Sequence, residues 1–143
     1  MKYYCEDPEL QQLYREHATD AGFDICAIED KWLFGEAWTP VKTGLHVSIP
    51  AGKVGFLKAR SGLSKKSNTD VHAGVIDSGY LGEVVVLLSV TKEKTPFHIT
   101  KGMRIAQLVV LDCDLSEPEK VNSLEELGTT ERGEKGFGST GGF

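Results

Sequence analysis

The sequence predicts an all-β fold, a jelly-roll-like sandwich or barrel subunit with a short helix and a flexible C-terminal arm. Many short apolar runs are separated by turns that contain Gly or Pro, as in β-sandwiches and jelly rolls. Residues 41–49 alternate strictly, which is typical of a strand with one buried face. Residues 131–143 are rich in glycine and cannot form a core by themselves.

The first forty residues predict one helix and one strand. Residues 7–16 are predicted to form a short helix, because Asp7 can cap it and Pro8 can take its first position. In the strand that follows, Asp24 alternates with apolar neighbours, so its carboxylate faces either solvent or a charged partner. Residues 28–39 are predicted to form a loop or short hairpin whose aromatic side chains cover the sheet, without a role in chemistry.

Further strands are predicted at residues 54–59, 84–90, 97–100 and 104–111. Residues 84–90 are apolar on both faces, which favours burial on both sides, between two sheets or against a neighbouring subunit. After the first of these strands, Ser61 suits the N-cap of a short turn of helix, and Arg60 adds a bidentate donor beside it. Together they suit a phosphate, although an ordinary helix cap explains the same residues.

Composition predicts one domain with an arm and argues against several classes of partner. The 143 residues carry a net charge of −5 and show no basic face, so broad nucleic-acid binding is not expected. No signal-peptide pattern and no apolar run of membrane-span length is evident. Three cysteines without metal-ligand spacing indicate reduced, buried thiols in a protein of the cytoplasm. We expect a β domain over residues 1–130 and an arm over residues 131–143.

Residues 74–83 form the stretch around which the chain is organised. Asp77 follows an apolar triplet, Ser78-Gly79 indicates a tight turn, and Tyr80 follows that turn. We interpret the stretch as a β-hairpin that holds an acid and an aromatic ring at its tip. The carboxylate can take a proton from water and the ring can pack on a sugar or base, while a turn-capping Asp is the plainer interpretation.

Two polar residues in the last strand raise a geometric problem. Strict alternation places Arg104 and Gln107 on opposite faces of residues 104–111. Both can serve one site only if the strand contains a bulge, or if the site lies where two chains meet. Each of them can also be a solvated surface residue.

The glycine-rich end has the parts of an anion cradle. It combines free backbone N–H groups and two hydroxyls with Arg132 and Lys135, although it lacks the order of residues of a Walker A loop. Phe137 is a large apolar residue in a segment that cannot pack on itself. The segment is therefore either a disordered tail or an arm that orders over a ligand, with Phe137 as a stacking surface.

Five stretches, in this order, resemble the trimeric dUTPase family. They are Ala21-Gly22-Phe23-Asp24, Arg60-Ser61-Gly62-Leu63, Gly74 to Gly82, Arg104-Ile105-Ala106-Gln107, and Arg132 with Gly136-Phe137-Gly138-Ser139-Thr140-Gly141. Each match is weak alone, but five in register over most of the chain form a specific pattern. Met103 and His72 depart from it, since the family often has Asp before the Arg and small residues or Asn in the base-reading hairpin.

The resemblance implies a jelly-roll homotrimer with active sites shared between chains. The implied reaction is hydrolysis of dUTP to dUMP and pyrophosphate, which keeps uracil out of DNA and supplies dUMP for thymidylate synthesis. Asp77 would activate a water that attacks the α-phosphorus, and Mg²⁺ would be held by the triphosphate and water, with Asp24 near its water shell. The implied location is the cytoplasm, or the host cytoplasm if the protein is viral. The resemblance does not determine whether the protein also binds a regulatory protein partner.

The resemblance also implies roles for the remaining site residues. Tyr80 would pack on the deoxyribose, Arg104 would support the Asp77 region, and Phe137 would stack on uracil. A narrow hairpin that reads the base through its backbone would reject the thymine methyl. Residues implied for the base hairpin are Val71, His72, Gly74, Val75 and Ile76, and those implied for the phosphates are Arg60, Ser61, Gly62, Gln107, Arg132, Gly138, Ser139 and Thr140.

Three other interpretations compete with this one. A deoxycytidine triphosphate deaminase is similar in fold but resembles residues 74–83 less. A nucleotide-sensing binding module would carry the same polar residues without turnover. A structural jelly roll without a ligand leaves Arg132, Phe137 and the glycine-rich end unexplained.

Overall fold

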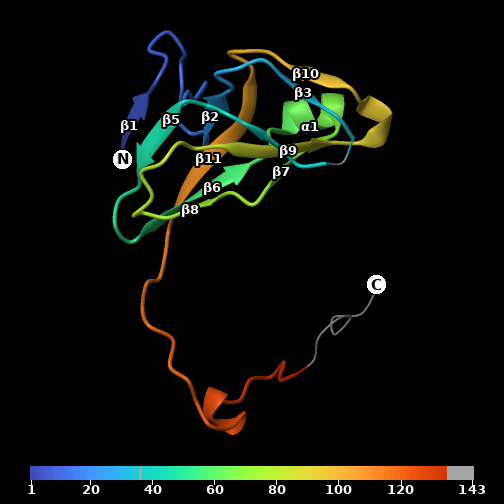
Figure 1. Ribbon diagram of the computed structural model, residues 1–143. Helices are drawn as coiled ribbons and strands as arrows, with labels where there is room; N and C mark the ends of the chain where they lie inside the picture. Colours follow the sequence, from blue (N-terminus) through green and yellow to red (C-terminus); the bar gives the residue numbers. More distant parts are fainter. Residues whose placement is uncertain (36, 135–143) are drawn as a thin grey trace.

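The computed structural model describes residues 1–35 and 37–134, and in this part of the chain the backbone is mostly strand (Figure 1). The strands are β1 (Lys2–Cys5), β2 (Gly22–Cys26), β3 (Lys31–Leu33), β4 (Thr39–Val41), β5 (Leu45–Ser48), β6 (Lys53–Lys58), β7 (Thr69–His72), β8 (Val75–Ile76), β9 (Val86–Val90), β10 (Phe97–Ile99) and β11 (Arg104–Asp112). The helical segments are α1 (Ser61–Ser67), η1 (Lys92–Lys94) and η2 (Glu125–Leu127).

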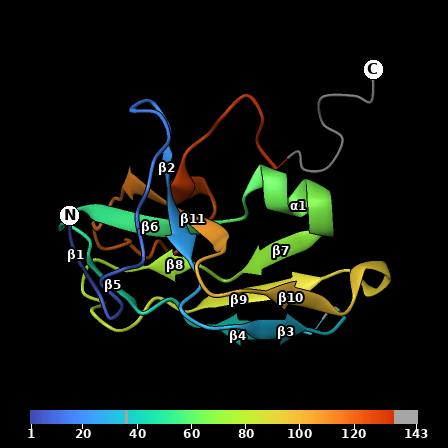
Figure 2. The same ribbon diagram turned by 90° about the horizontal axis from the view of Figure 1, so that it is seen from above.

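Two antiparallel sheets enclose the core. One has the strand order β2-β11-β6-β8 and the other β4-β9-β7, while β1 pairs with β5 and β3 with β10. Figure 2 shows β6 and β11 on one side of the domain and β4 and β9 on the other. The buried side chains between them come from both sheets, so the predicted jelly-roll β fold is confirmed. The core includes Ile25, Val41, Leu45, Val47, Leu57, Val86, Leu88, Val90, Ile105 and Leu108.

The short helix lies beside β7 rather than near the N-terminus. Helix α1 ends at Ser67, and its C-cap residue Asn68 adopts a left-handed backbone with φ of 51° and donates its N–H to Ser64 O at 2.7 Å. The predicted helix at residues 7–16 is wrong, because that segment contains only turns, bends, irregular backbone and a single β-bridge from Tyr14 to Asp24. Leu13 has φ of 54°, a left-handed conformation that a helix cannot contain.

Gln12 explains why residues 7–16 leave a helical path. Its side chain is buried, with Nε2 donating to Cys26 O at 2.9 Å and to Thr43 O at 2.8 Å. Its Oε1 accepts the N–H of Cys26 at 2.8 Å. The amide thus satisfies backbone groups at the end of β2, a long-range arrangement that local helix signals do not contain.

The alternation of residues 41–49 is confirmed as a pattern of burial, but not as one strand. Val41, Thr43, Leu45, Val47 and Ile49 are all buried. Gly44 has φ of 61°, and a Cβ there would lie 2.4 Å from Ile28 Cδ1, so the backbone turns between β4 and β5. Residues 28–39 also differ from expectation, since β3 pairs with β10 and β4 with β9 instead of with each other.

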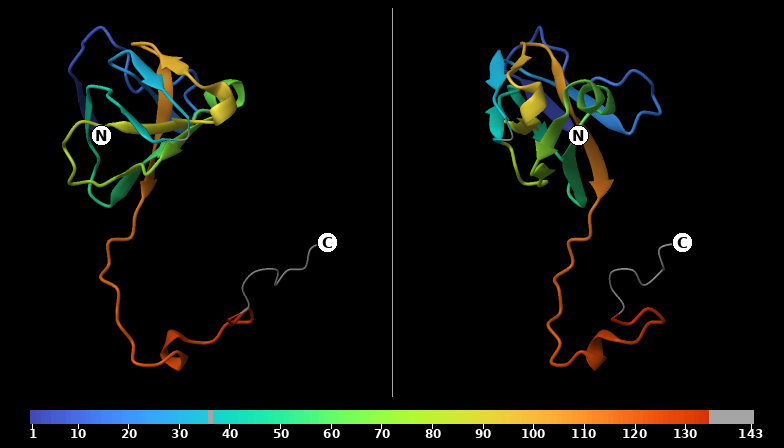
Figure 3. Two further views of the ribbon diagram at one scale, coloured as in Figure 1. Left: turned by 45° about the vertical axis from the view of Figure 1, so that its right-hand side comes forward. Right: turned by 90° about the vertical axis from the view of Figure 1, so that its right-hand side faces the viewer.

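The chain leaves the sheets after β11. Cys113 N–H still donates to Gly52 O at 2.9 Å, and from there residues 114–134 run away from the domain (Figure 3). Three apolar side chains of this segment are exposed, namely Leu115, Leu124 and Leu127. The described residues hold no helix that is long and apolar enough to cross a membrane. The expected boundary at residue 130 stays a prediction.

The buried amide of Gln12 gives a stability prediction. Gln12→Ala leaves the N–H and C=O of Cys26 without this partner, so it should lower the free energy of unfolding by about 2–4 kcal/mol. The neighbouring Gln11 is exposed, so Gln11→Ala should change it by less than about 0.5 kcal/mol. Urea unfolding of both variants measures the difference, and equal losses would contradict the bonding role of Gln12.

Candidate active site

Two separate cavities collect the residues that the sequence predicts for a site. We call them the arginine cavity, of about 450 Å³, and the Asp77 cavity, of about 280 Å³. The arginine cavity is lined by Tyr14, Arg15, Glu16, Asp20, Ala21, Gly22, Asp24, Arg60, Ser61, Gly62, Arg104 and Gln107. The Asp77 cavity is lined by Leu57, His72, Ala73, Gly74, Val75, Ile76, Asp77, Tyr80, Glu83, Val85 and Leu87. Among the residues that the structure describes, the two cavities share none.

Asp24 organises the arginine cavity. Its Oδ1 accepts from Arg60 Nε at 2.7 Å, and its Oδ2 lies 3.6 Å from Arg104 Nη1. Arg60 also donates to the backbone oxygen of Arg104 at 3.2 Å, and the Arg104 guanidinium stacks 4.2 Å above the Tyr14 ring. The Asp24 carboxylate, which the sequence places inside a strand, therefore has two charged partners. It holds the guanidinium groups of Arg60 and Arg104 in the cavity.

A β-bulge brings Arg104 and Gln107 into the same cavity. Arg104 pairs with Cys26 and Ala106 with Ile25, so Ile105 is an extra residue on the β11 side. Ile105 and Ala106 are both buried, which breaks the alternation of the strand. The bulge was one of the two solutions predicted for this pair, and a meeting of two chains is not needed to explain it.

Gln107 is held in place by close contacts. Its Nε2 donates to Ala59 O at 3.0 Å, and its side chain lies against Gly22. A Cβ at position 22 would lie 2.1 Å from Gln107 Oε1, so Gly22 leaves room for the amide. The glycine of the second strand therefore shapes the arginine cavity through Gln107.

Ser61 differs from its predicted role. It is the first residue of α1, while Arg60 takes the N-cap position with an extended backbone and no side-chain cap hydrogen bond. Within the described residues, the Ser61 hydroxyl makes no hydrogen bond. It is exposed at the wall of the arginine cavity, where it is available to a ligand.

Asp77 lies at the end of β8, but residues 74–83 are not a hairpin. β8 pairs with β6, whereas β9 pairs with β4 and β7, so the chain crosses from one sheet to the other. The N–H of Tyr80 donates to Asp77 O at 3.1 Å, which confirms the tight turn, and the Tyr80 hydroxyl donates to Glu83 O at 2.8 Å. Acid and ring thus line one cavity, on a crossover connection rather than at the tip of a hairpin.

Glu83 and His46 anchor this turn, and sequence reasoning missed both roles. Glu83 Oε1 accepts the N–H groups of Thr43 at 3.2 Å and Gly44 at 2.9 Å. His46 Nδ1 lies 3.0 Å from Leu81 O, and its Nε2 lies 3.3 Å from Glu6 Oε1. Hydrogen bonding to Leu81 O and then to Glu6 raises the pKa of His46. The contacts span about forty positions, so no local signal indicates them.

Other predicted residues lie outside the two cavities or outside the described residues. Val71 packs its side chain against the core, so only its backbone can face a ligand. Arg104 lies with Asp24 and not in the Asp77 cavity, so on one chain it does not support Asp77 directly. Arg132 lies in the extended segment, the name we give to residues 114–134, which run away from the domain. Phe137, Gly138, Ser139 and Thr140 lie outside the described residues.

Comparison with known proteins connects this geometry to a family. The family model described as dUTPase matches residues 9–141. Deoxyuridine 5'-triphosphate nucleotidohydrolases from Corynebacterium jeikeium and Rhodococcus erythropolis are 44% and 41% identical, over 94% and 95% of this chain and 88% and 82% of theirs. The Staphylococcus bacteriophage 80alpha dUTPase with dUpNHpp has a TM-score of 0.85 at 32% identity, covering 98% of this chain and 97% of the phage chain.

The His46 anchor predicts a pH dependence of stability. Its pKa is raised in the folded protein, so its contribution is complete below about pH 6.5, the value in an unfolded chain. The contribution is lost as pH rises through the folded pKa. The urea midpoint should therefore fall between pH 6 and pH 8, and His46→Asn should flatten that fall. His17→Asn, at an exposed histidine, should leave it unchanged, and equal behaviour of the two variants would contradict the anchor.

Proposed function

Because the chain belongs to the dUTPase family, we propose that it hydrolyses dUTP to dUMP and pyrophosphate through a water that Asp77 activates for attack on the α-phosphorus. The observation that carries this proposal is that the two cavities present different chemical groups. One presents a free carboxylate beside an aromatic ring, and the other presents arginines, a hydroxyl and an amide. The carboxylate and the ring suit the nucleoside and the attacking water, and the arginines, the hydroxyl and the amide suit the triphosphate.

Asp77 suits the role of general base. It is exposed at the end of β8, and among the described residues its carboxylate has no ion-pair or hydrogen-bond partner. A water molecule can therefore approach it, and the carboxylate can accept the proton of that water as the oxygen attacks phosphorus. The turn beneath it is fixed by Glu83 and His46, which keeps the carboxylate in position for the attack.

The Asp77 cavity suits the nucleoside. Ala73 and Gly74 both have positive φ, 56° and 101°, and a Cβ at Gly74 would lie 3.0 Å from Leu57 O. This compact backbone next to His72 would read the uracil edge, and Tyr80 would pack on the deoxyribose and exclude a 2′-hydroxyl. Val71, Val75 and Ile76 would supply the surrounding backbone. The pocket is small, as expected for one pyrimidine nucleoside.

The arginine cavity suits the phosphates only with additional positive charge. Arg15, Arg60 and Arg104 face Glu16, Asp20 and Asp24, so the charges of the lining balance. Arg60, Ser61, Gly62 and Gln107 would bind the phosphate oxygens. A strongly anionic triphosphate needs more cation than this lining provides, which supports Mg²⁺ and a contribution from Arg132.

The donor set fits a magnesium ion that arrives with the nucleotide. Among the described residues no group of three His, Cys, Asp or Glu side chains could hold a metal alone, and Mg²⁺ is commonly bound through one or two carboxylates and substrate phosphates. When bound, the ion supplies charge neutralisation on the triphosphate. Asp24 would lie near its water shell while remaining paired with Arg60. A bacteriophage phi11 dUTPase structure describes the coordination of a structural Mg(II) ion.

We propose that the complete site forms between chains of a homotrimer. On one chain the two cavities are separate, so a ligand that uses both requires the Asp77 cavity of one subunit and the arginine cavity of another. The exposed leucines of the extended segment favour packing of that segment on a neighbour. The arm would then bring Arg132, Ser139 and Thr140 to the phosphates and Phe137 to the uracil, with Gly138 allowing close approach.

In the cell, this reaction would remove dUTP and supply dUMP. A cytoplasmic location agrees with Cys5, Cys26 and Cys113, which are free. The direct test is product analysis of dUTP, dCTP, dTTP and UTP incubated with the protein and Mg²⁺. We expect dUMP and pyrophosphate from dUTP. Ammonia from dCTP would replace the proposal with a deaminase, and turnover of none of the four would replace it with a binding module.

Asp77→Asn tests the base directly. The substitution keeps the shape of the side chain but removes its basicity, so turnover should fall by about 10²–10⁴-fold with nucleotide affinity largely kept. Pyrophosphate release measures turnover, and calorimetry with dUpNHpp measures affinity. Asp70→Asn, at an exposed aspartate of β7, is the matched control and should retain turnover. Unchanged turnover in Asp77→Asn would remove Asp77 from the mechanism.

Mixing two inactive variants tests the shared site. Asp77→Asn disables one cavity and Arg60→Ala the other, so each homotrimer should be inactive. After joint refolding in equal amounts, about a quarter of inter-chain sites combine two intact cavities, and activity should return to that fraction. A site contained in one chain can never regain both cavities, so no recovery from correctly folded mixed trimers would contradict sharing.

A further inference from the structure

Trp38 reaches the Asp77 cavity through a second aromatic residue. Its ring stacks on His72 with the ring centroids 4.6 Å apart and the planes 16° from parallel. His72 lines the Asp77 cavity, whereas Trp38 does not. On the other side, His72 Nε2 lies 2.6 Å from Ser89 Oγ. The imidazole is therefore held on one face by a ring and at one edge by a hydroxyl.

The sheet β4-β9-β7 creates this arrangement. Thr39 pairs with Leu88 and His72 with Leu87, so Trp38 and His72 flank the central strand β9. Leu88 is buried, while Leu87 and Ser89 face the opposite side of the sheet. Leu87 also lines the Asp77 cavity. Trp38 thus reaches across β9, on its outer face, to the histidine at the end of β7.

We propose that Trp38 is a positioning residue and His72 a specificity-determining residue for the base. This inference rests on the proposed hydrolysis of dUTP and extends it to the choice of base. A histidine side chain at a strand end has several rotamers, and the stack together with the Ser89 bond selects one. The fixed imidazole sets the width of the cavity, so the 5-methyl group of a thymine base clashes with a ring that cannot move aside.

The fixed ring also has a free polar atom. Among the described residues, no group hydrogen bonds to His72 Nδ1. That nitrogen is therefore available to the edge of a bound pyrimidine. Ser89 determines its role, because a hydroxyl that donates to Nε2 leaves Nδ1 as the protonated donor, and one that accepts from Nε2 leaves Nδ1 as an acceptor.

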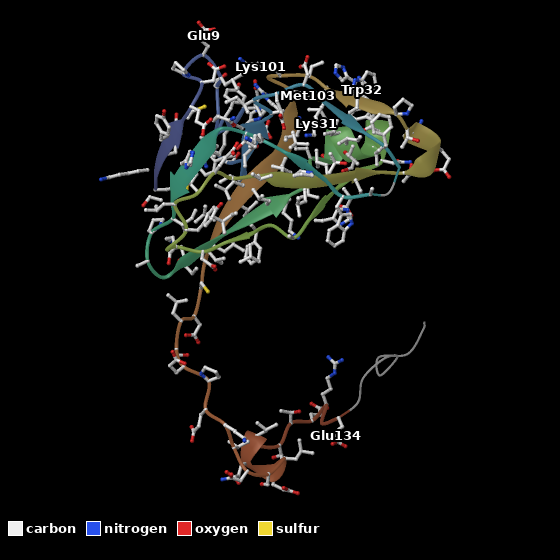
Figure 4. The ribbon with its side chains drawn as sticks, viewed as in Figure 1. Glu9, Lys31, Trp32, Lys101, Met103 and Glu134 are labelled. Carbon is white, nitrogen blue, oxygen red and sulfur yellow. The ribbon has the colours of Figure 1, made fainter. Side chains whose placement is uncertain are left out.

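A second tryptophan–histidine stack provides a matched control. Trp32 stacks on His98 with centroids 4.3 Å apart and planes 26° from parallel. This pair lies across β3 and β10, and Figure 4 shows Trp32 at the outer edge of the domain. His98 lines a third cavity together with Met103, and that cavity also borders Arg60 and Arg104. Trp32 has the same chemistry and similar exposure as Trp38, but no connection to the Asp77 cavity.

The test compares Trp38→Ala with Trp32→Ala in the full-length protein. In Trp38→Ala, KM for dUTP should rise and the preference for dUTP over dTTP in kcat/KM should fall, each by about threefold to tenfold, the factor that one aromatic contact represents. The kcat for dUTP should stay within about twofold, because Asp77 is fixed by a separate set of contacts. Trp32→Ala should leave the preference for dUTP over dTTP unchanged, because neither Trp32 nor His98 lines the Asp77 cavity.

Fluorescence gives a readout that does not depend on turnover. In the Trp32→Phe background, emission reports Trp38 alone, and titration with dUMP should change it. In the Trp38→Phe background, the emission of Trp32 should stay constant. Thermal unfolding shows whether each variant is folded, and Trp38→Leu replaces Trp38→Ala if the latter is not.

The outcomes separate this inference from the proposed function. If the unmodified protein hydrolyses dUTP but Trp38 and Trp32 variants keep the same base preference, the inference is overturned and the function stands. If the protein binds dUMP without turnover, the Trp38 emission still decides the inference. If the protein neither hydrolyses dUTP nor binds dUMP, both are overturned.

Discussion

Strand β11 fixes the geometry on which both the core and the arginine cavity depend. It pairs with β2 on one side and β6 on the other, and its inward residues fill the middle of the core. A single extra residue, Ile105, lets the strand remain paired while Arg104 and Gln107 turn to the same side. Without that bulge, one of the two side chains would have to enter the core or leave the cavity.

Long-range polar contacts fix the turn that carries Asp77. In the described part of the chain, the strand pairing of residues 78–83 is limited to an isolated bridge between Glu83 and His46. The Glu83 carboxylate adds to it by accepting two backbone N–H groups from residues 43 and 44. The His46 ring holds Leu81 O in the same way from β5. The exposed Asp77, on a crossover connection, is thereby supported by side chains from distant parts of the sequence.

Two ring stacks connect the peripheral strands to their neighbours, but only one of them ends at the Asp77 cavity in the described part of the chain. Trp38 reaches His72 across β9, while Trp32 and His98 lie on the β3–β10 pair. Both tryptophans are half exposed or more, so neither is explained by burial. The difference between them lies in what the stacked histidine faces, since His72 lines the Asp77 cavity and His98 lines another.

The sequence by itself determined the class of fold, the buried face of residues 41–49 and the tight turn that joins Asp77 to Tyr80. Through five short motifs it also determined the family. These features depend on alternation and turn chemistry, which act between neighbouring residues. Only the tertiary structure decided that residues 7–16 are not helical, because the buried amide of Gln12 outweighs local propensity. It also decided that residues 74–83 cross between sheets and that the site residues divide into two cavities, since both depend on contacts between residues distant in sequence.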